Sequence, residues 1–473
     1  MLRAGSRVIT LAQGCAIGVL AYVATSALAQ GDAFERELPP IKAPAEITLP
    51  SAPAAEPRIE PLESEATHWT PAADGVFLPY EAAWPARAVK QGERLQGVIK
   101  TIDAPVLTRR AQRAYWPLVA EPDDRADALA LRDAAGMTRE PNWNFEGPGY
   151  LIFRFEAPIA ADAAPREIEV FKFISGRTLK KPAGADDVPT LAVERTWFSF
   201  YPAKNATVRG TALVMPGLWG TPEPIIDSTV ASLRREGWAV VRMLSQPSRF
   251  TEQVDFSIDA GEIAAAADRI AEVYNQRAAE CAYAVEAAFD HVLRRHPELA
   301  KLPRVAVGMS GGAITLPTVV AREADKYAAA VIVAGAADLW LTSSRSAYDA
   351  MMVHALDVTW VGGTPDTTAQ QMLDREYLAS APLDPYHTAA ALRNKPVLMI
   401  HATADLAVPS DLGDVLWQRL GKPKRITMDV GHELLFMNVP KMLPQVMEFL
   451  RGASGKPGAG TAEAAKPAGQ ASQ

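Results

Sequence analysis

The strongest constraint on the fold is an alternation of short apolar runs with helical segments, from about residue 150 to residue 451. Short apolar strands that alternate with helices are typical of a parallel sheet covered by helices on both faces. We therefore expect an α/β fold with a mostly parallel twisted sheet. The predicted strands are 150–155, 167–174, 195–201, 211–215, 238–244, 305–307, 329–333, 396–400 and 426–430, and the predicted helices are about 224–236, 259–295, 309–323 and 440–450.

The ends of the chain differ in composition from this core. Residues 1–29 have the form of a cleaved secretory signal, with Arg3 and Arg7 before an apolar stretch and Ala27 and Ala29 at a small-residue cleavage site. The alternatives are an uncleaved anchor helix or a lipid on Cys15, and the sequence around Cys15 matches a lipidation signal poorly. Residues 30–65 form a linker rich in Pro and Ala, and residues 452–473 a disordered tail. Residues 66–149 form an N-terminal extension, which leaves 150–451 for the α/β domain.

Composition excludes several classes of protein. The formal net charge of −7 argues against a nucleic-acid partner, because nucleic-acid binders usually carry a basic face. The two cysteines cannot form a disulfide scaffold. Cys15 leaves with the signal, and Cys281 lies in an Ala-rich helical run where a small buried side chain is expected. No spacing of His, Cys, Asp or Glu resembles a zinc site, and no dinucleotide or phosphate loop is present, so neither a metal nor a cofactor is expected.

The sharpest local feature is the segment 308–312, which reads G-x-S-x-G with Ser310 at its centre. It lies between a predicted strand and a predicted helix. A serine on such a tight turn needs small neighbours, and the turn lifts its hydroxyl clear of the sheet. The N–H groups at the start of the following helix favour a negative charge that develops beside the hydroxyl. The pattern therefore predicts a nucleophilic serine.

An acid and a histidine follow at the ends of later predicted strands. Asp405 comes soon after strand 396–400, and His432 follows Gly431 after strand 426–430. The carboxyl ends of parallel strands share one edge of the sheet, so these side chains are expected near Ser310. Asp338, after strand 329–333, is the alternative acid, and the strand–loop context favours Asp405. Ser310 would attack a carbonyl, His432 would take its proton, and Asp405 would orient the imidazole.

These motifs, in this chain order, resemble those of the α/β-hydrolase-fold serine hydrolases over about residues 150–451. That resemblance implies an oxyanion loop at Met215-Pro216-Gly217-Leu218-Trp219-Gly220, with the backbone N–H groups of Gly311 and of Leu218 or Trp219 as donors. Most members have His-Gly where this chain has Pro216-Gly217. Pro317 is a second departure, and we expect it to kink or shorten the helix after Ser310.

Two groups of aromatic residues have open roles. Residues 338–390 interrupt the alternation and fit an inserted helical cap, whose Trp340 and Trp360 either pack the cap or, with Met309, line a substrate pocket. Trp69, Trp84, Trp116 and Trp143 in the N-terminal extension either pack against the hydrolase body or form a binding surface.

The sequence as a whole predicts an exported serine esterase, periplasmic or secreted, that acts on a small-molecule ester through an acyl-enzyme. It would have no stable membrane anchor once the signal is removed, and its oligomeric state is open. Two other functions remain open from the sequence. One is a hydrolase-like protein that only binds a partner or ligand. The other is a peptidase or thioesterase with the same three residues, because the triad does not encode the leaving group.

Overall fold

A computed structural model describes a little over half of the chain's length. The predicted signal, the linker, the strand at 150–155 and the tail beyond residue 454 lie outside the described residues. The described residues are 76–78, 97–102, 124–134, 142–144, 169–180, 190–218, 221–244, 246–247, 250, 254–347, 356–363 and 365–454.

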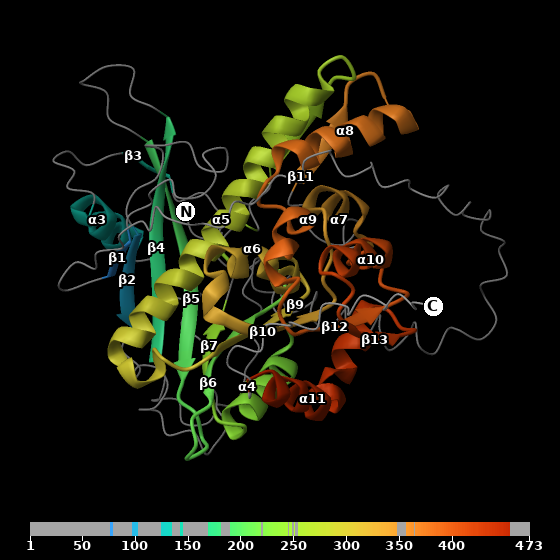
Figure 1. Ribbon diagram of the computed structural model, residues 1–473. Coiled ribbons are helices and arrows are strands. Elements are labelled where there is room, and N and C mark those ends of the chain that lie inside the picture. The colour runs from blue at the N-terminus through green and yellow to red at the C-terminus, as the bar shows by residue number, and fades with distance from the viewer. Residues whose placement is uncertain are drawn as a thin grey trace, which may run out of the picture. The chain divides into compact units, whose positions relative to one another are not determined.

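A parallel sheet forms the centre of the fold (Figure 1). Its strands lie in the order β7-β6-β9-β10-β12-β13, and every neighbouring pair in that series is parallel. Four of them, β6, β7, β9 and β12, are buried along their whole length, which explains why they are largely continuous apolar runs rather than alternating ones. The strands are β6 (Gly210–Met215), β7 (Trp238–Met243), β9 (Arg304–Met309), β10 (Tyr327–Val333), β12 (Val397–Ala402) and β13 (Lys424–Met428).

Antiparallel strands extend the sheet beyond β7. The long strands β4 and β5 pair with each other, β5 pairs with β7, and β2 joins β4 to β1. The short strand β3 pairs in parallel with β5. Strands of the predicted N-terminal extension are therefore hydrogen-bonded into the same sheet as the α/β core. These strands are β1 (Val76–Leu78), β2 (Gly97–Ile102), β3 (Asn142–Asn144), β4 (Glu169–Lys180) and β5 (Thr190–Tyr201).

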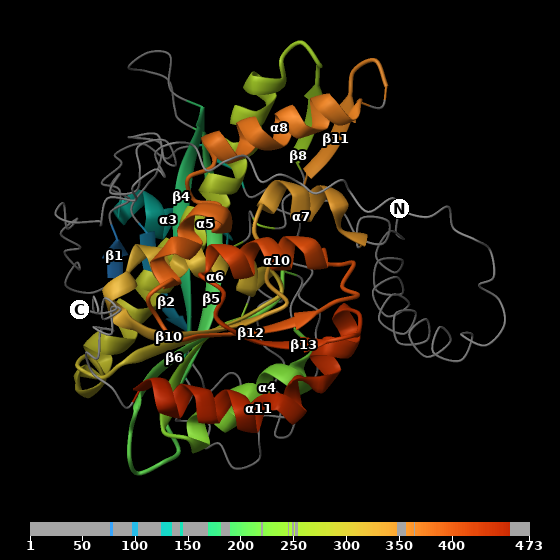
Figure 2. The same cartoon turned by 45° about the vertical axis from the view of Figure 1, so that its right-hand side comes forward.

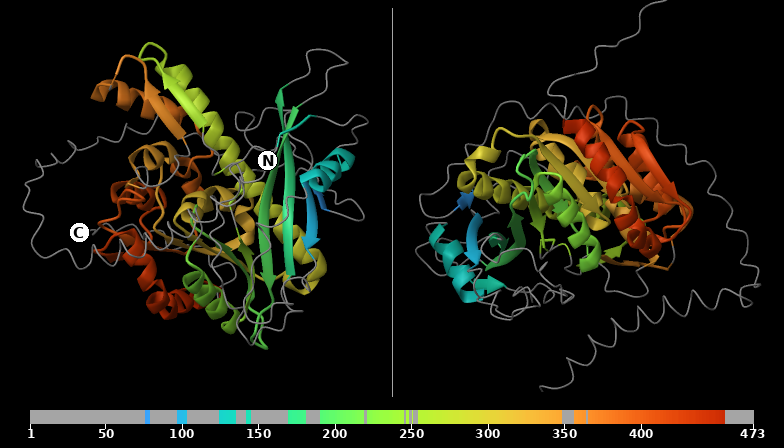
Figure 3. Two further views of the ribbon diagram at one scale, coloured as in Figure 1. Left: turned by 180° about the vertical axis from the view of Figure 1, so that it is seen from behind. Right: turned by 90° about the horizontal axis from the view of Figure 1, so that it is seen from below.

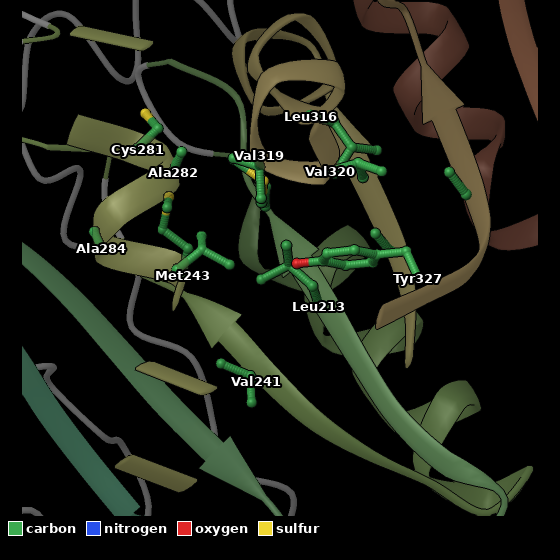
Figure 4. Packing of buried hydrophobic residues seen from close by; sticks show 14 of the residues in the cluster. Leu213, Val241, Met243, Cys281, Ala282, Ala284, Leu316, Val319, Val320 and Tyr327 are labelled. Atoms are coloured by element: carbon green, nitrogen blue, oxygen red, sulfur yellow. The ribbon is translucent and has the colours of Figure 1, made fainter. Parts of the chain in front are cut away.

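Helices cover both faces of the parallel sheet, as the alternation predicted (Figure 2). On one face α4 (Glu223–Arg235) and α11 (His432–Ser454) pack on each other and on the sheet. On the other lie α5 (Ile263–Arg295), α6 (Gly311–Arg322) and α10 (Ser410–Arg419). Figure 4 shows this second core, in which side chains of β6 and β7 meet those of α5 and α6. A further helix, α3 (Asp124–Ala134), contacts β2 and β4.

The predicted cap segment contains a strand as well as helices. Its strand β11 (Leu356–Trp360) pairs in parallel with β8 (Val254–Ile258), and its helix α8 (Thr367–Ser380) packs on α5 (Figure 3, left). The sequence did not indicate this strand, because β11 is short and its partner lies about a hundred residues earlier in the chain. The remaining helical elements are α7 (Leu339–Arg345), α9 (Pro385–Thr388), and the 3₁₀ turns Pro297–Leu299, Ala324–Lys326 and Ala389–Leu392.

Two helices contain prolines in their interior. The helix after Ser310 was expected to be kinked or shortened by Pro317, and α6 is not shortened, because it continues through Pro317 to Arg322. The last helix was expected to span about residues 440–450. Instead α11 begins at His432, holds both Pro440 and Pro444 in its interior, and runs three residues into the predicted tail.

A buried histidine makes the stability of the fold sensitive to acid. His291 on α5 packs against the ring of Phe171 on β4, with ring centroids 4.6 Å apart. Burial, helped by Arg295, lowers the pKa of His291 to about 4. The unfolded chain therefore binds a proton that the folded chain excludes, so stability falls as the pH drops below the unfolded pKa of about 6.5.

We expect His291→Phe to remove this acid sensitivity. Relative to the variant, the wild-type free energy of unfolding should fall by about 2 kcal/mol between pH 7 and pH 5. Urea denaturation of both proteins at both pH values measures the difference. If the free energies of unfolding of the two proteins differed by the same amount at pH 7 and at pH 5, the lowered pKa of His291 would be contradicted.

Candidate active site

Ser310 occupies the turn between β9 and α6 in a strained backbone conformation. Its φ is 51° and its ψ is −120°, a region that side-chain-bearing residues rarely adopt. The turn is tied to the sheet by the Ser310 N–H, which donates to the Val333 carbonyl oxygen at 2.9 Å. The side chain is only partly buried, unlike the strand before it and the helix after it. The hydroxyl therefore stands at the carboxyl edge of the sheet, beside the N-terminus of α6.

The flanking glycines are needed because the backbone passes too close for any side chain. A Cβ atom on Gly308 would lie 2.6 Å from the Gly312 carbonyl oxygen, and one on Gly312 would lie 2.4 Å from the Pro216 carbonyl oxygen. Both distances are shorter than real carbon contacts, so the G-x-S-x-G spacing follows from the close packing of this turn.

The three side chains singled out in the sequence form one hydrogen-bonded chain. The His432 Nε2 atom lies 3.1 Å from the Ser310 hydroxyl oxygen, and its Nδ1 atom lies 2.7 Å from Asp405 Oδ2. The imidazole and the carboxylate are both buried, and the ring of Phe436 packs edge-on against the imidazole at 4.9 Å. This geometry suits proton transfer from a serine hydroxyl to an imidazole that a carboxylate orients.

Local backbone contacts hold both partners of Ser310 in place. The second oxygen of Asp405, Oδ1, accepts hydrogen bonds from the N–H groups of Ala407 and Val408 at 3.0 and 2.8 Å. His432 is the first residue of α11, where the loop from β13 meets that helix. The Ala404 N–H donates to the Val430 carbonyl, so the acid loop and the histidine loop are bonded to each other.

Asp338, the alternative acid, lies elsewhere. Its side chain caps α7 by accepting the Leu341 N–H at 2.8 Å, and its own N–H donates to Asp384. Burial, together with the neighbouring Asp374 and Asp384, raises the pKa of Asp338 well above its ordinary value. Of the two acids, only Asp405 contacts the histidine among the described residues.

The predicted oxyanion loop lies against the start of α6. A Cβ atom on Gly311 would lie 2.6 Å from the backbone nitrogen of Leu218, so these two peptide groups are neighbours. Gly311 is the first residue of α6, and the first N–H groups of a helix have no partner within it. Leu218 and Gly311 are therefore suitably placed as a pair of backbone donors. Trp219, the alternative donor, lies outside the described residues.

Two residues that the sequence analysis missed hold this loop. The Thr221 hydroxyl accepts the Gly217 N–H at 2.9 Å, and the Gln246 side-chain amide donates to the Pro216 carbonyl at 3.0 Å. The spacing of Thr221 from Gly217 is a weak local signal of such a contact. Nothing local indicates Gln246, because its partner lies 30 residues away.

We expect Gly311→Ala to reduce kcat about 100-fold, because the added methyl group displaces the Leu218 peptide and disturbs the donor pair. Gly452→Ala near the end of α11 is the matched control, since nothing lies within 4 Å of the added Cβ atom. Steady-state ester hydrolysis by the two purified variants measures the effect. Equal kcat values for both would contradict the placement of the donors.

Two of the three predicted pocket residues are packed into cores, and the third packs against one of these cores. Met309 is fully buried in the cluster between the sheet and the helices α4 and α11, so it fills the core rather than an open pocket. Trp340 is buried with Ile314 and Val408 in a different cluster, which lies under the cap segment. Trp360 packs against that cluster from β11. Cap packing thus accounts for both tryptophans, and a role for them at the substrate is a prediction only.

Structural contacts account for Cys281 and for Asp429, the carboxylate three residues before His432. Cys281 is fully buried, as predicted, and burial raises the pKa of its thiol well above the ordinary value. Asp429 accepts a hydrogen bond from the exposed Thr403 hydroxyl.

Among the residues that the structure describes, no helix has the length and apolar character needed to cross a membrane. Within the same residues, no group of three His, Cys, Asp or Glu side chains could hold a metal ion.

A family comparison agrees with this site. The model of the prolyl oligopeptidase family matches residues 273–438, a stretch that contains Ser310, Asp405 and His432. The chain is an α/β hydrolase. It is a serine hydrolase, because the matched family and the hydrogen-bonded Ser310, His432 and Asp405 both indicate hydrolysis with a serine nucleophile.

Several solved structures are similar to this α/β hydrolase. Est1E from Butyrivibrio proteoclasticus is 14% identical, with 55% of this chain and 96% of that chain covered and a TM-score of 0.37. An esterase from Pyrococcus furiosus, Pf2001, is 15% identical, with 55% of this chain and 87% of that chain covered and a TM-score of 0.37. An acylaminoacyl peptidase from Pyrococcus horikoshii is 14% identical, with 56% of this chain and 41% of that chain covered and a TM-score of 0.39. No curated protein matches the sequence.

Proposed function

We propose that this α/β hydrolase is an exported serine esterase that cleaves a small-molecule carboxylic ester through an acyl-enzyme. The observation that carries the proposal is the hydrogen-bonded chain from the Ser310 hydroxyl through His432 to Asp405. A serine hydroxyl is a weak nucleophile unless a base takes its proton, and this arrangement supplies that base.

The proposed reaction has two halves. The Ser310 oxygen attacks the ester carbonyl while its proton passes to His432 Nε2, and the backbone N–H groups of Gly311 and Leu218 stabilise the oxyanion. The tetrahedral intermediate collapses when the C–O bond to the alcohol breaks and His432 returns the proton to the leaving oxygen. Water then attacks the acyl-enzyme while its proton passes to His432. The bond between the acyl carbon and the Ser310 oxygen breaks, His432 returns the proton to that oxygen, and the carboxylic acid leaves. Throughout, Asp405 holds the Nδ1–H tautomer of His432.

The matched family favours a second candidate, a peptidase, because its model is named for prolyl oligopeptidases. An amide differs from an ester in its leaving group, and the contacts that select a leaving group lie outside the triad. We favour the ester because its cleavage demands less from the general acid than cleavage of an amide does.

A substrate screen with an active-site probe tests the proposal. The mature protein is assayed on matched para-nitrophenyl esters, anilides and thioesters, and wild type and Ser310→Ala are treated with a fluorophosphonate probe. We expect ester turnover and labelling that requires Ser310. Faster turnover of the anilides would favour the peptidase. Labelling without turnover of any substrate would reject the esterase, and absence of both would favour a protein that only binds.

The proposed location is the periplasm or the exterior, on the basis of the signal-like residues 1–29. The mature chain would then hold one cysteine, Cys281, whose complete burial suits an oxidising compartment, because it prevents intermolecular disulfides. Detection of a mature N-terminus at Gln30 in a periplasmic or culture fraction would test the proposed export.

A further inference from the structure

We propose that Gln246 is a positioning residue for the oxyanion hole. Its side-chain amide holds the Pro216 carbonyl, and through that peptide it sets the position of the Leu218 N–H. This inference rests on the proposed esterase function and adds a residue that contacts neither the substrate nor the three catalytic side chains.

Gln246 is buried between the oxyanion loop and α5. Its Nε2 atom donates to the Pro216 carbonyl oxygen at 3.0 Å, and its Oε1 atom lies 3.3 Å from the sulfur of Cys281. Only 4% of Gln246 and none of Cys281 is exposed, so water does not compete for these contacts. A buried amide bonded at both ends is held in one orientation.

Donor and acceptor chemistry fixes which way the amide faces. A carbonyl oxygen can only accept, so the NH₂ group of Gln246 must face Pro216. The Oε1 atom then faces Cys281, whose S–H donates to it. Burial keeps this thiol protonated by raising its pKa, which preserves the donor. Cys281 therefore has a specific role, which is to orient Gln246.

The held carbonyl belongs to the part of the loop that forms the oxyanion hole. The Pro216 carbonyl oxygen lies beside Gly312 at the start of α6, so close that a Cβ atom on that glycine would be 2.4 Å from it. Gln246 restrains it from the side of α5, and Thr221 takes the next N–H, that of Gly217. With those two groups occupied, the following donor, Leu218 N–H, lies beside Gly311. The Pro216 carbonyl and the Gly217 N–H belong to one peptide group, so loss of the Gln246 amide would leave that group held only at its N–H, by Thr221. The peptide could then tilt about this remaining bond and shift the neighbouring Leu218 N–H from its position.

Gln246→Met tests the proposal, because it keeps the length of the side chain and removes the amide. Gln276→Met is the matched control, a buried glutamine on α5 that bonds to Glu272 instead. We expect Gln246→Met to lower kcat on para-nitrophenyl butyrate about 10- to 100-fold with little change in KM. The control should keep the wild-type kcat.

A boronic acid separates positioning from a merely structural role. Butylboronic acid forms a tetrahedral adduct with a catalytic serine and places an oxygen where the oxyanion forms. Its affinity should fall in Gln246→Met by the same factor as kcat. Loss of kcat with unchanged boronic acid affinity, or an unchanged kcat in the folded variant, would overturn the proposal.

If Gln246→Met does not fold, the variants Cys281→Ala and Cys281→Ser test the proposal instead, because they change the group that orients Gln246. Alanine cannot donate to Gln246 Oε1, whereas serine can, so boronic acid affinity should fall in the first and be largely restored in the second. Equal affinity in both variants would overturn the proposal. A wild-type protein with no ester turnover would reject the esterase itself and this inference with it, whereas an active wild type with insensitive variants would reject this inference alone.

Discussion

The Ser310→Ala protein is expected to hydrolyse para-nitrophenyl esters about 10⁴- to 10⁶-fold more slowly than the wild type. Without the hydroxyl no acyl-enzyme can form, and His432 has no proton to accept. The residual rate would come from the oxyanion donors and from binding of the ester. Purified variant and wild type are compared by steady-state kinetics, with burst-phase measurement of the acyl-enzyme.

Ser454→Ala provides the control for this experiment. Ser454 also has glycines nearby, at positions 452 and 455, but it ends helix α11 and does not occupy a strand-to-helix turn. We expect its kcat to match the wild type. Hydrolysis that persists undiminished in Ser310→Ala would show that Ser310 is not the nucleophile.

The Asp405→Asn protein is expected to lose about 10⁴-fold in kcat. The N–H groups of Ala407 and Val408 require an acceptor, so the amide oxygen of the new asparagine takes the place of Oδ1. Its NH₂ group must then face His432 Nδ1, which becomes an acceptor. The ring proton moves to Nε2, and the imidazole can no longer take the proton of Ser310. The loss should appear in kcat with little change in stability.

Asp338→Asn is the matched control, because the sequence offered Asp338 as the other acid. Since burial favours the protonated form of Asp338, an asparagine there resembles the side chain already present. Its oxygen can still cap α7. We expect kcat near the wild-type value. A large loss in Asp338→Asn combined with a small loss in Asp405→Asn would reverse the assignment of the acid.

The three candidate catalytic side chains could be predicted because their signals are local. Ser310 lies in a turn that only small neighbours permit, and Asp405 and His432 each follow an apolar strand. Parallel strands end at one edge of a sheet, so the strand pattern alone placed the three side chains near one another. The structure adds the distances and selects Asp405 over Asp338 as the partner of His432.

Other features depended on contacts between distant segments. Strand β11 is visible only through its pairing with β8, and Gln246 gains its place at the oxyanion loop only through Pro216 and Cys281. The start of α11 at His432 was obscured by Pro440, which the helix tolerates in its interior. Met309 was predicted to line a pocket, whereas its side chain lies in the core between the sheet and the helices α4 and α11.

The amino-acid sequence was sufficient to predict the α/β fold, the candidate serine and histidine, and a short list of candidate acids. Those depend on hydrophobic periodicity and on turn geometry, which are properties of neighbouring residues. Tertiary contacts were needed to show which acid meets His432, how β11 of the cap pairs with β8, and what holds the oxyanion loop. These depend on hydrogen bonds between side chains and peptides far apart in the chain, whose partners are set by the packing of α5, α6 and the sheet.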